Sequence, residues 1–136
     1  MKIAVSAMGN SLDAMVDPRF GRCPYFVIAE VENNEIKGSK SIENPAVKTV
    51  GGAGVMAAQL VAGEGVEAII TGNVGPNAYA ALSNAGIKIM TGVGGVTVKN
   101  AVEMYLKGDL KETTQPTTPG FGPGGGTGAG RGFGRR

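Results

Sequence analysis

The sequence predicts an α/β domain in which a mixed five-stranded sheet is covered by about three helices. Three observations support this class. A strand-like hairpin lies in the first third of the chain, helical and strand-like segments alternate after it, and glycine turns separate most of the elements. With 136 residues, of which 42% are hydrophobic, the chain has enough material for one globular core.

The N-terminal part is expected to form three strands. Ile3–Ala7 is a short apolar run that ends at a Met-Gly-Asn turn. Tyr25–Val31 and Glu35–Ile42 flank Asn33-Asn34, a spacing typical of an antiparallel hairpin. Between the first two strands, two X-Pro pairs within residues 10–24 interrupt any helix, so we expect an irregular loop there.

Helices and strands alternate in the second half of the chain. The predicted elements are a helix at about Val55–Glu64, a strand at Val66–Thr71, a helix at Pro76–Ala85, a strand at Ile87–Met90 and a helix that begins at Thr97 and ends near Gly108. Because a helix joins the last two strands, they should be parallel with a right-handed crossover. We expect the first strand to be parallel to them and the second strand to be antiparallel.

The C-terminal residues differ in composition from the rest of the chain. Residues 111–136 contain nine glycines, three prolines and few large apolar groups, so we predict a folded domain over residues 1–110 and a disordered tail over 111–136. The domain holds nine basic and ten acidic residues, whereas the tail holds four and one. A near-neutral domain argues against a folded nucleic-acid-binding surface.

Several protein classes are excluded or disfavoured by what the sequence lacks. A single cysteine cannot form an internal disulfide, and no run of about 18 apolar residues could span a membrane. The N-terminus has no signal-peptide pattern, so we expect a cytoplasmic protein. There is no histidine and no recognisable nucleophile or phosphate-loop motif. We therefore expect a protein that is not an enzyme and has no catalytic residues.

A candidate binding site is predicted at one edge of the sheet. In open α/β sheets, ligands bind beyond the carboxyl ends of the parallel strands. Turns rich in glycine and small polar residues follow those ends at Ser6–Asn10, Thr71–Gly75 and Thr91–Gly95. The antiparallel second strand begins at this edge, so Arg19–Pro24 should lie beside the turns. The predicted rim thus combines arginines, a cysteine and backbone N–H groups.

The residue types at this rim fit an anionic metal–sulfur cluster. Arg19 and Arg22 supply fixed positive charge, and Cys23 supplies a soft ligand if the neighbouring arginines favour its thiolate. A phosphate or nucleotide would use the arginines and glycines but not Cys23. Two further points stay open: Cys23 can be a small buried hydrophobic residue, and the arginines are either solvated or paired with Asp13 and Asp17.

Three segments resemble the dinitrogenase iron–molybdenum cofactor biosynthesis family, the NifX-like proteins. The segments are Asp17–Phe26, Gly51–Gly54 and Thr71–Ala78, and the resemblance extends over roughly residues 1–108. It implies a ribonuclease-H-like sheet and the binding or carrying of iron–sulfur or iron–molybdenum precursors without catalysis. The cofactor-binding residues expected from the rim are Ser6, Gly9 and Gly94, and those implied by the resemblance are Arg19, Phe20, Gly21, Arg22, Cys23, Gly72, Asn73, Gly75 and Asn77.

The resemblance leaves the mode of binding open. Cys23 is the single candidate metal ligand, whereas a cubane cluster usually takes four thiolates. We therefore expect labile ligation, electrostatic capture or sharing between subunits, in a monomer or weak homo-oligomer. The expected partners are the cluster and a cofactor-biosynthesis protein. Two alternatives remain: an anion- or nucleotide-binding regulatory module, and an iron–sulfur storage or assembly protein that uses its cationic tail.

Overall fold

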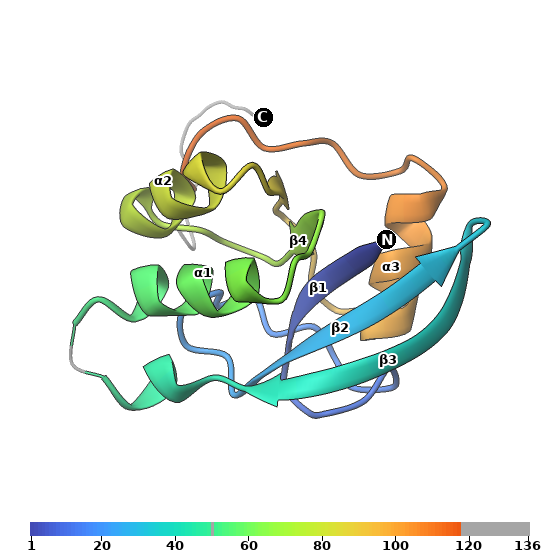
Figure 1. Ribbon diagram of the computed structural model, residues 1–136, viewed down its shortest axis with the longest axis horizontal. Coiled ribbons are helices and arrows are strands. Elements are labelled where there is room, and N and C mark those ends of the chain that lie inside the picture. The colour runs from blue at the N-terminus through green and yellow to red at the C-terminus, as the bar shows by residue number, and fades with distance from the viewer. Residues whose placement is uncertain (50, 118–136) are drawn as a thin grey trace.

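A computed structural model describes residues 1–49 and 51–117 of the chain (Figure 1). The strands are β1 (Lys2–Ala7), β2 (Tyr25–Glu32), β3 (Glu35–Glu43), β4 (Ala68–Ile70) and β5 (Lys88–Met90). The helices are α1 (Ala53–Gly63), α2 (Pro76–Asn84) and α3 (Val98–Leu106), with a short 3-10 helix η1 (Pro45–Lys48) after β3. The predicted order of strands and helices is confirmed, and η1 is an additional element that was not predicted from the sequence.

All five strands form one mixed sheet in the order β3-β2-β1-β4-β5. β2 is antiparallel to both β1 and β3, whereas β1, β4 and β5 are parallel to one another. Asn33 and Asn34 turn the β2–β3 hairpin with positive φ angles, a conformation that asparagine tolerates better than most residues. The mixed α/β class is confirmed, whereas the ribonuclease-H-like description stays a prediction.

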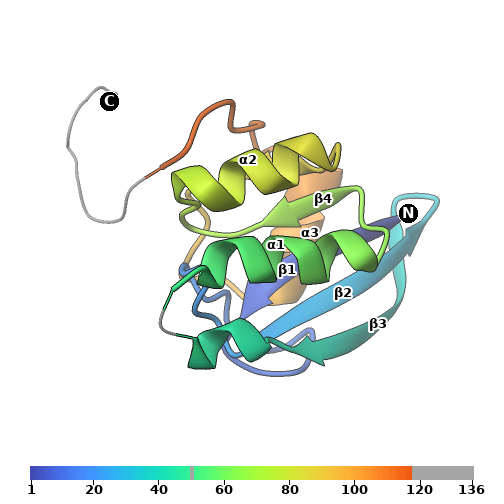
Figure 2. The ribbon, with the colours of Figure 1, turned by 60° about the vertical axis from the view of Figure 1, so that its left-hand side comes forward.

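Alternation along the strands creates a core on each face of the sheet. On β2, Phe26 and Ile28 point into the cluster under α1 and α2, whereas Val27 and Ala29 point into the cluster under α3. Figure 2 shows α1 and α2 side by side in front of the sheet and α3 behind it. The molecule therefore has three layers, with the carboxyl ends of β1, β4 and β5 at one edge.

The first residues of the predicted tail are attached to the sheet. Glu112 forms an antiparallel bridge with Met90, and Thr113 N donates to the Ile89 carbonyl oxygen at 2.6 Å. Thr117 N then donates to the Val74 carbonyl oxygen at 2.7 Å. We call residues 112–117 the strap. The remainder of the predicted tail, residues 118–136, lies outside the described residues.

The helices of the described part are all short. α1 is the longest of them, with 11 residues. Accordingly, none of the helices in residues 1–49 and 51–117 is long and apolar enough to cross a membrane.

Candidate functional site

Glycines allow three segments to approach closely at the carboxyl edge of the sheet. Gly72 lies directly against Pro18, since a Cβ added to Gly72 would be 2.5 Å from the Pro18 Cβ. Asn73 N donates to the Pro18 carbonyl oxygen at 2.9 Å, which fixes the loop after β4 beside the loop before β2. A Cβ on Gly21 would similarly lie 3.1 Å from Gly54 N. These contacts bring together the loop before β2 and the N-terminal ends of α1 and α2.

The three segments line an open hollow of about 220 Å³ at the surface. Its lining residues are Phe20, Gly21, Gly54, Asn73, Gly75, Pro76, Asn77 and Ala78. Phe20 is almost fully buried, and its ring packs against that of Phe26 with centroids 5.3 Å apart. None of the lining side chains carries a charge, so any charge preference of the hollow comes from the backbone.

Two helix N-termini meet at this hollow. Gly52 is the N-cap of α1 and Gly75 is the N-cap of α2, and neither can supply a side-chain cap. By contrast, Thr97 caps α3, where its Oγ1 accepts a hydrogen bond from Asn100 N at 3.2 Å. The first N–H groups of a helix have no partner within the helix, and the helix dipole makes this end positive. The hollow is therefore suited to an anion.

Five of the predicted binding residues line the hollow, and they come from the two motif segments. They are Phe20, Gly21, Asn73, Gly75 and Asn77. Gly72 is not in the lining, but its contact with Pro18 holds the two segments together. The expected convergence of the loop before β2 with the turn after β4 is thus present in the structure.

The residues expected from the ends of β1 and β5 do not reach the hollow. Ser6 was expected to bind the ligand, but it is fully buried, and its Oγ is hydrogen-bonded to the Asp17 carbonyl oxygen at 2.6 Å and to Thr71 Oγ1 at 2.7 Å. Gly9 packs against Ala14, and Gly94 is exposed outside the lining. The expectation for Ser6 is wrong, because a buried hydroxyl engaged with two protein oxygens ties β1 to its neighbours instead.

The two arginines are engaged with protein groups. Arg19 Nε and Nη2 donate to the Asp17 carboxylate at 3.0 and 2.8 Å, one of the two arrangements that the sequence left open. Burial alone would raise the pKa of Asp17, but the hydrogen bonds and charge of Arg19 outweigh it and lower that pKa. Arg22 Nη1 donates to the Thr49 carbonyl oxygen at 2.7 Å. Neither side chain lines the hollow.

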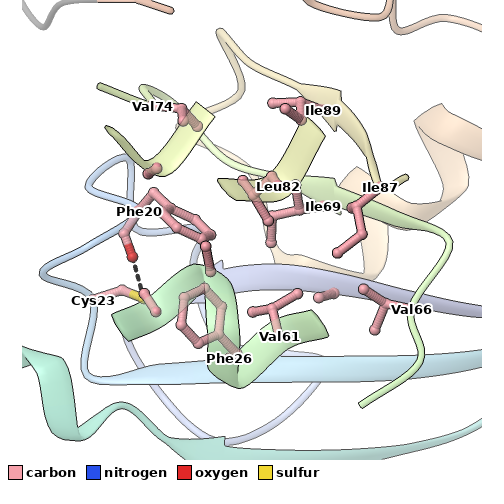
Figure 3. Packing of buried hydrophobic residues seen from close by; sticks show 14 of the residues in the cluster. Phe20, Cys23, Phe26, Val61, Val66, Ile69, Val74, Leu82, Ile87 and Ile89 are labelled. Carbon is pink, nitrogen blue, oxygen red and sulfur yellow. Dashed lines mark hydrogen bonds between the residues drawn. The ribbon is translucent and has the colours of Figure 1, made fainter. Parts of the chain in front are cut away.

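Cys23 differs most clearly from its predicted role as a metal ligand. Its side chain is fully buried within the α1–α2 core cluster, and Sγ donates to the Phe20 carbonyl oxygen at 3.4 Å. Figure 3 shows the sulfur among the aromatic and aliphatic side chains of that cluster. Burial, together with the negative charge of Asp17, raises the pKa of Cys23 to about 12. The expected lowering by the arginines is wrong, and the buried-hydrophobe alternative describes this thiol.

Two further lining residues, Gly54 and Ala78, were not among the predicted binding residues, and Pro76, which the resemblance places in the loop after β4, also lines the hollow. A signal for Gly54 existed, because the Gly51–Gly54 cluster precedes a helix, and such an N-terminus can hold an anion. Its close approach to Ala78, whose Cβ would lie 3.0 Å from a Cβ added to Gly54, could not be predicted from the sequence. Within residues 1–49 and 51–117, no group of three or more His, Cys, Asp or Glu side chains could hold a metal ion.

The sequence matches known proteins along most of its length. Residues 1–108 match the family described as dinitrogenase iron-molybdenum cofactor. An uncharacterized protein of Methanocaldococcus jannaschii is 38% identical over 112 residues, which make up 82% of this chain and 91% of that protein. The family match over residues 1–108 includes all three lining segments of the hollow.

Solved structures share the fold described above. The apo form of the orange protein from Desulfovibrio gigas has a TM-score of 0.81 at 39% identity, with 86% of this chain and 96% of that chain covered. An NMR structure of a provisionally named NifB protein from Thermotoga has a TM-score of 0.72 at 33% identity, with 88% and 98% covered. Both similarities extend over nearly the whole length of the relatives.

Proposed function

The chain belongs to the dinitrogenase iron–molybdenum cofactor family, and from that premise we propose that it carries an anionic metal–sulfur cluster or precursor in the hollow between α1 and α2. The observation that supports this most directly is the convergence of two helix N-termini, capped by Gly52 and Gly75, on one hollow. Both ends offer backbone N–H donors and a positive dipole end, which favour a negatively charged ligand.

We further propose that the cluster is held without covalent ligation by this chain. The thiol of Cys23 is buried and has a raised pKa, so it offers no thiolate at neutral pH. The described residues also lack a set of side chains that could coordinate a metal. Backbone donors can bind the outer sulfur atoms of a preformed anion and release it again intact. This mode suits a carrier and does not require the protein to perform a reaction.

An anion-binding regulatory module is the second candidate. It is favoured by the same two helix N-termini, because a phosphate oxygen accepts hydrogen bonds from backbone N–H groups as readily as a sulfide does. The two candidates differ in the ligand and not in the site. A direct competition between a molybdenum–sulfur anion and a phosphate anion therefore separates them.

The decisive experiment changes the charge at Gly75. A side chain fits there, because the residue has an extended backbone with φ −73° and a Cβ would meet no atom within 4 Å. Gly75→Asp and Gly75→Asn both supply an N-cap side chain, but only Asp brings a negative charge to the hollow. Thr97→Asp places the same charge at the N-terminus of α3 on the opposite face of the sheet. It is the matched control.

Binding is measured anaerobically with thiomolybdate as the probe, by equilibrium dialysis and visible absorption, with inorganic phosphate as competitor. We expect Gly75→Asp to weaken thiomolybdate binding at least about tenfold relative to Gly75→Asn, and Thr97→Asp to bind like the wild type. Equal binding by the two Gly75 variants would place the ligand elsewhere. Displacement by equimolar phosphate would favour the regulatory module over the carrier.

Cys23→Ser tests the non-covalent mode separately. Because the thiol is buried away from the hollow, we expect this variant to bind thiomolybdate as the wild type does, provided that its circular dichroism spectrum is unchanged. Reconstitution with iron and sulfide should likewise give the same absorbance in both proteins. A folded Cys23→Ser variant that loses the ligand would mean that the thiol becomes exposed and ligates the metal.

A further inference from the structure

The strap holds two loops at the carboxyl edge of the sheet through a repeated pattern of hydrogen bonds. At Thr113, the backbone N–H donates to the Ile89 carbonyl oxygen at 2.6 Å, and Oγ1 accepts from Thr91 N at 3.1 Å. At Thr117, the backbone N–H donates to the Val74 carbonyl oxygen at 2.7 Å, and Oγ1 accepts from Val74 N at 2.8 Å. The first threonine therefore holds the loop after β5, and the second holds the loop after β4.

The residue that Thr117 holds lies between two residues of the hollow. Asn73 and Gly75 both line the hollow, and Val74 joins them. The Val74 side chain is almost fully buried in the core cluster under α1 and α2, and both of its backbone polar groups are bonded to Thr117. Figure 1 shows the strap, in orange, crossing from α3 to the side of α2. A residue 43 positions later in the chain thus fixes one wall of the hollow.

The planarity of the peptide group extends this effect to a donor at the hollow. The Val74 carbonyl and the Gly75 N–H belong to one planar group and point in opposite directions. Because Thr117 N holds that carbonyl, it also sets the direction of the Gly75 N–H, and Gly75 is the N-cap of α2. On the other side, Asn73 N donates to the Pro18 carbonyl oxygen at 2.9 Å. The turn is therefore held from two sides.

We propose that Thr117 is a positioning residue for the anion-binding hollow, a role that rests on the proposed function. Thr117 is not in the lining and acts through Val74, by setting the angle at which the Gly75 N–H meets a bound anion. Hydrogen bonds weaken steeply when their angle departs from linearity, so a turned donor binds less well. The strap begins after residue 108, where the family match ends, so this contribution comes from outside the matched residues.

The strap is attached more weakly than the elements that it joins. None of its six residues is buried, so it is held mainly by the hydrogen bonds of its two threonines. Segments with few buried contacts open at a lower free energy than the core does. Detachment of the strap would release both polar groups of Val74 while the core stays folded. The strap therefore couples its own attachment to the affinity of the hollow.

The test compares the same substitution at the two threonines of the strap. Thr117→Val keeps the shape of the side chain but removes the acceptor for Val74 N. Thr113→Val removes the acceptor for Thr91 N, which lies outside the lining of the hollow, and is the matched control. Thr117→Ser returns the hydroxyl and tests rescue.

Thiomolybdate binding is measured by anaerobic equilibrium dialysis on the full chain. We expect Thr117→Val to bind about fivefold more weakly than the wild type, and Thr113→Val and Thr117→Ser to bind within about twofold of it. Both valine variants should lose similar stability in urea, so a merely structural role would change both affinities alike. Wild-type affinity in Thr117→Val, or an equal loss of affinity in both valine variants, would overturn the proposal.

Amide hydrogen exchange of the unliganded protein separates this proposal from the carrier function. We expect the Val74 and Gly75 amides to exchange about tenfold faster in Thr117→Val than in the wild type, whereas Thr113→Val should change the Thr91 amide instead. A wild-type protein that does not bind thiomolybdate would refute the carrier function. Unchanged exchange at Val74 in Thr117→Val would refute the positioning role, whatever the wild-type protein binds.

Discussion

The two faces of the sheet are covered in different ways. On the α3 face, one amphipathic helix is capped by Thr97, buries Val98, Ala101 and Val102, and presents Lys99 to solvent. On the other face, α1 and α2 begin at glycines, lack side-chain caps and carry no charge. Each face has its own core cluster, so the contrast does not arise from a lack of packing on either side.

This difference indicates a division of roles within one small domain. The first N–H groups of α3 are satisfied within the protein: Val98 N donates to the Ala14 carbonyl oxygen, Lys99 N to that of Leu12 and Asn100 N to Thr97 Oγ1. The N-terminal residues of α1 and α2 instead line a shared hollow, where in the proposed function a bound anion would accept hydrogen bonds from the backbone. Ligand binding should therefore depend on the α1–α2 face, while stability can be altered on either face.

The largest loss of stability is expected from a substitution at Gly72, where the loop after β4 contacts the loop before β2. Gly72→Ala places a Cβ within 2.8 Å of three Pro18 atoms, two of which belong to the backbone. We expect a loss of about 3 kcal/mol in the free energy of unfolding, because backbone atoms cannot move aside cheaply. Urea denaturation measures this loss.

Gly75→Ala is the control for this substitution. Gly75 is close in sequence and also adjoins the hollow, but an added Cβ meets no atom within 4 Å. We expect a change of less than about 1 kcal/mol. Equal effects of the two substitutions would contradict the close contact between Gly72 and Pro18.

The strap at the edge of the sheet should contribute the next largest effect. A chain that ends at Leu110 loses the hydrogen bonds of Thr113 to Ile89 and Thr91 and those of Thr117 to Val74. At about 0.5 kcal/mol net for each of these four hydrogen bonds, the low end of the usual range, we expect a loss of about 2 kcal/mol in the free energy of unfolding. A chain that ends at Thr117 should unfold like the full chain. Thermal and urea unfolding of both truncations would show whether the folded domain extends to residue 117.

Substitutions at the helix N-caps should change stability in opposite directions on the two faces of the sheet. Thr97→Ala removes the cap of α3 and should cost about 1 kcal/mol, and Thr97→Ser should restore most of that loss. Gly75→Asn supplies a cap that α2 lacks and should gain about 0.5 kcal/mol. These opposite signs would be measured as shifts in the urea midpoint. A loss of stability in Gly75→Asn would mean that the α2 N-terminus is already satisfied by other protein groups.

Local signals were sufficient to predict the elements of this fold. The Asn33-Asn34 turn, Pro76 in the first turn of a helix and Thr97 as a cap all have the predicted roles. Parallel and antiparallel strands followed from the connections between them. The strap was not predicted, because a composition rich in Gly and Pro indicates only that few side chains can be buried. Composition gives no indication of the few backbone hydrogen bonds by which Thr113 and Thr117 attach to the rest of the domain.

The site was predicted only in part, for a different reason. The segments at Phe20 and Asn73 were expected to meet, and they do. Whether a side chain at the edge of a sheet points outward or inward depends on tertiary packing, and so Ser6 and Cys23 were assigned to the wrong environment. The approach of Gly54 to the same hollow depends on how two helices pack, which no local pattern encodes.

The smallest effect at neutral pH, and a distinctive one at alkaline pH, should come from Cys23. Its pKa is raised from 9.0 to about 12 in the folded state, chiefly by burial in the α1–α2 core cluster. Above about pH 9 the unfolded chain loses the thiol proton first, so stability falls as the pH rises from about 9 toward about 12. The free energy of unfolding then falls by up to about 1.4 kcal/mol per pH unit, and the thiol causes almost no loss of stability below about pH 9.

Cys23→Ala isolates this contribution, because the other titrating groups are common to both proteins. Urea denaturation between pH 8 and pH 10.5 should give curves for the two proteins that run parallel at the acidic end and converge as the pH rises. The buried members of the α3 core cluster carry no titratable side chain; Tyr105, which packs against them and has a raised pKa, is common to both proteins and so cancels in the comparison. Curves that stay parallel throughout would mean that the folded protein ionises the thiol as easily as the unfolded chain does. The α1–α2 face would then be open to solvent at the position where direct metal ligation by Cys23 becomes feasible.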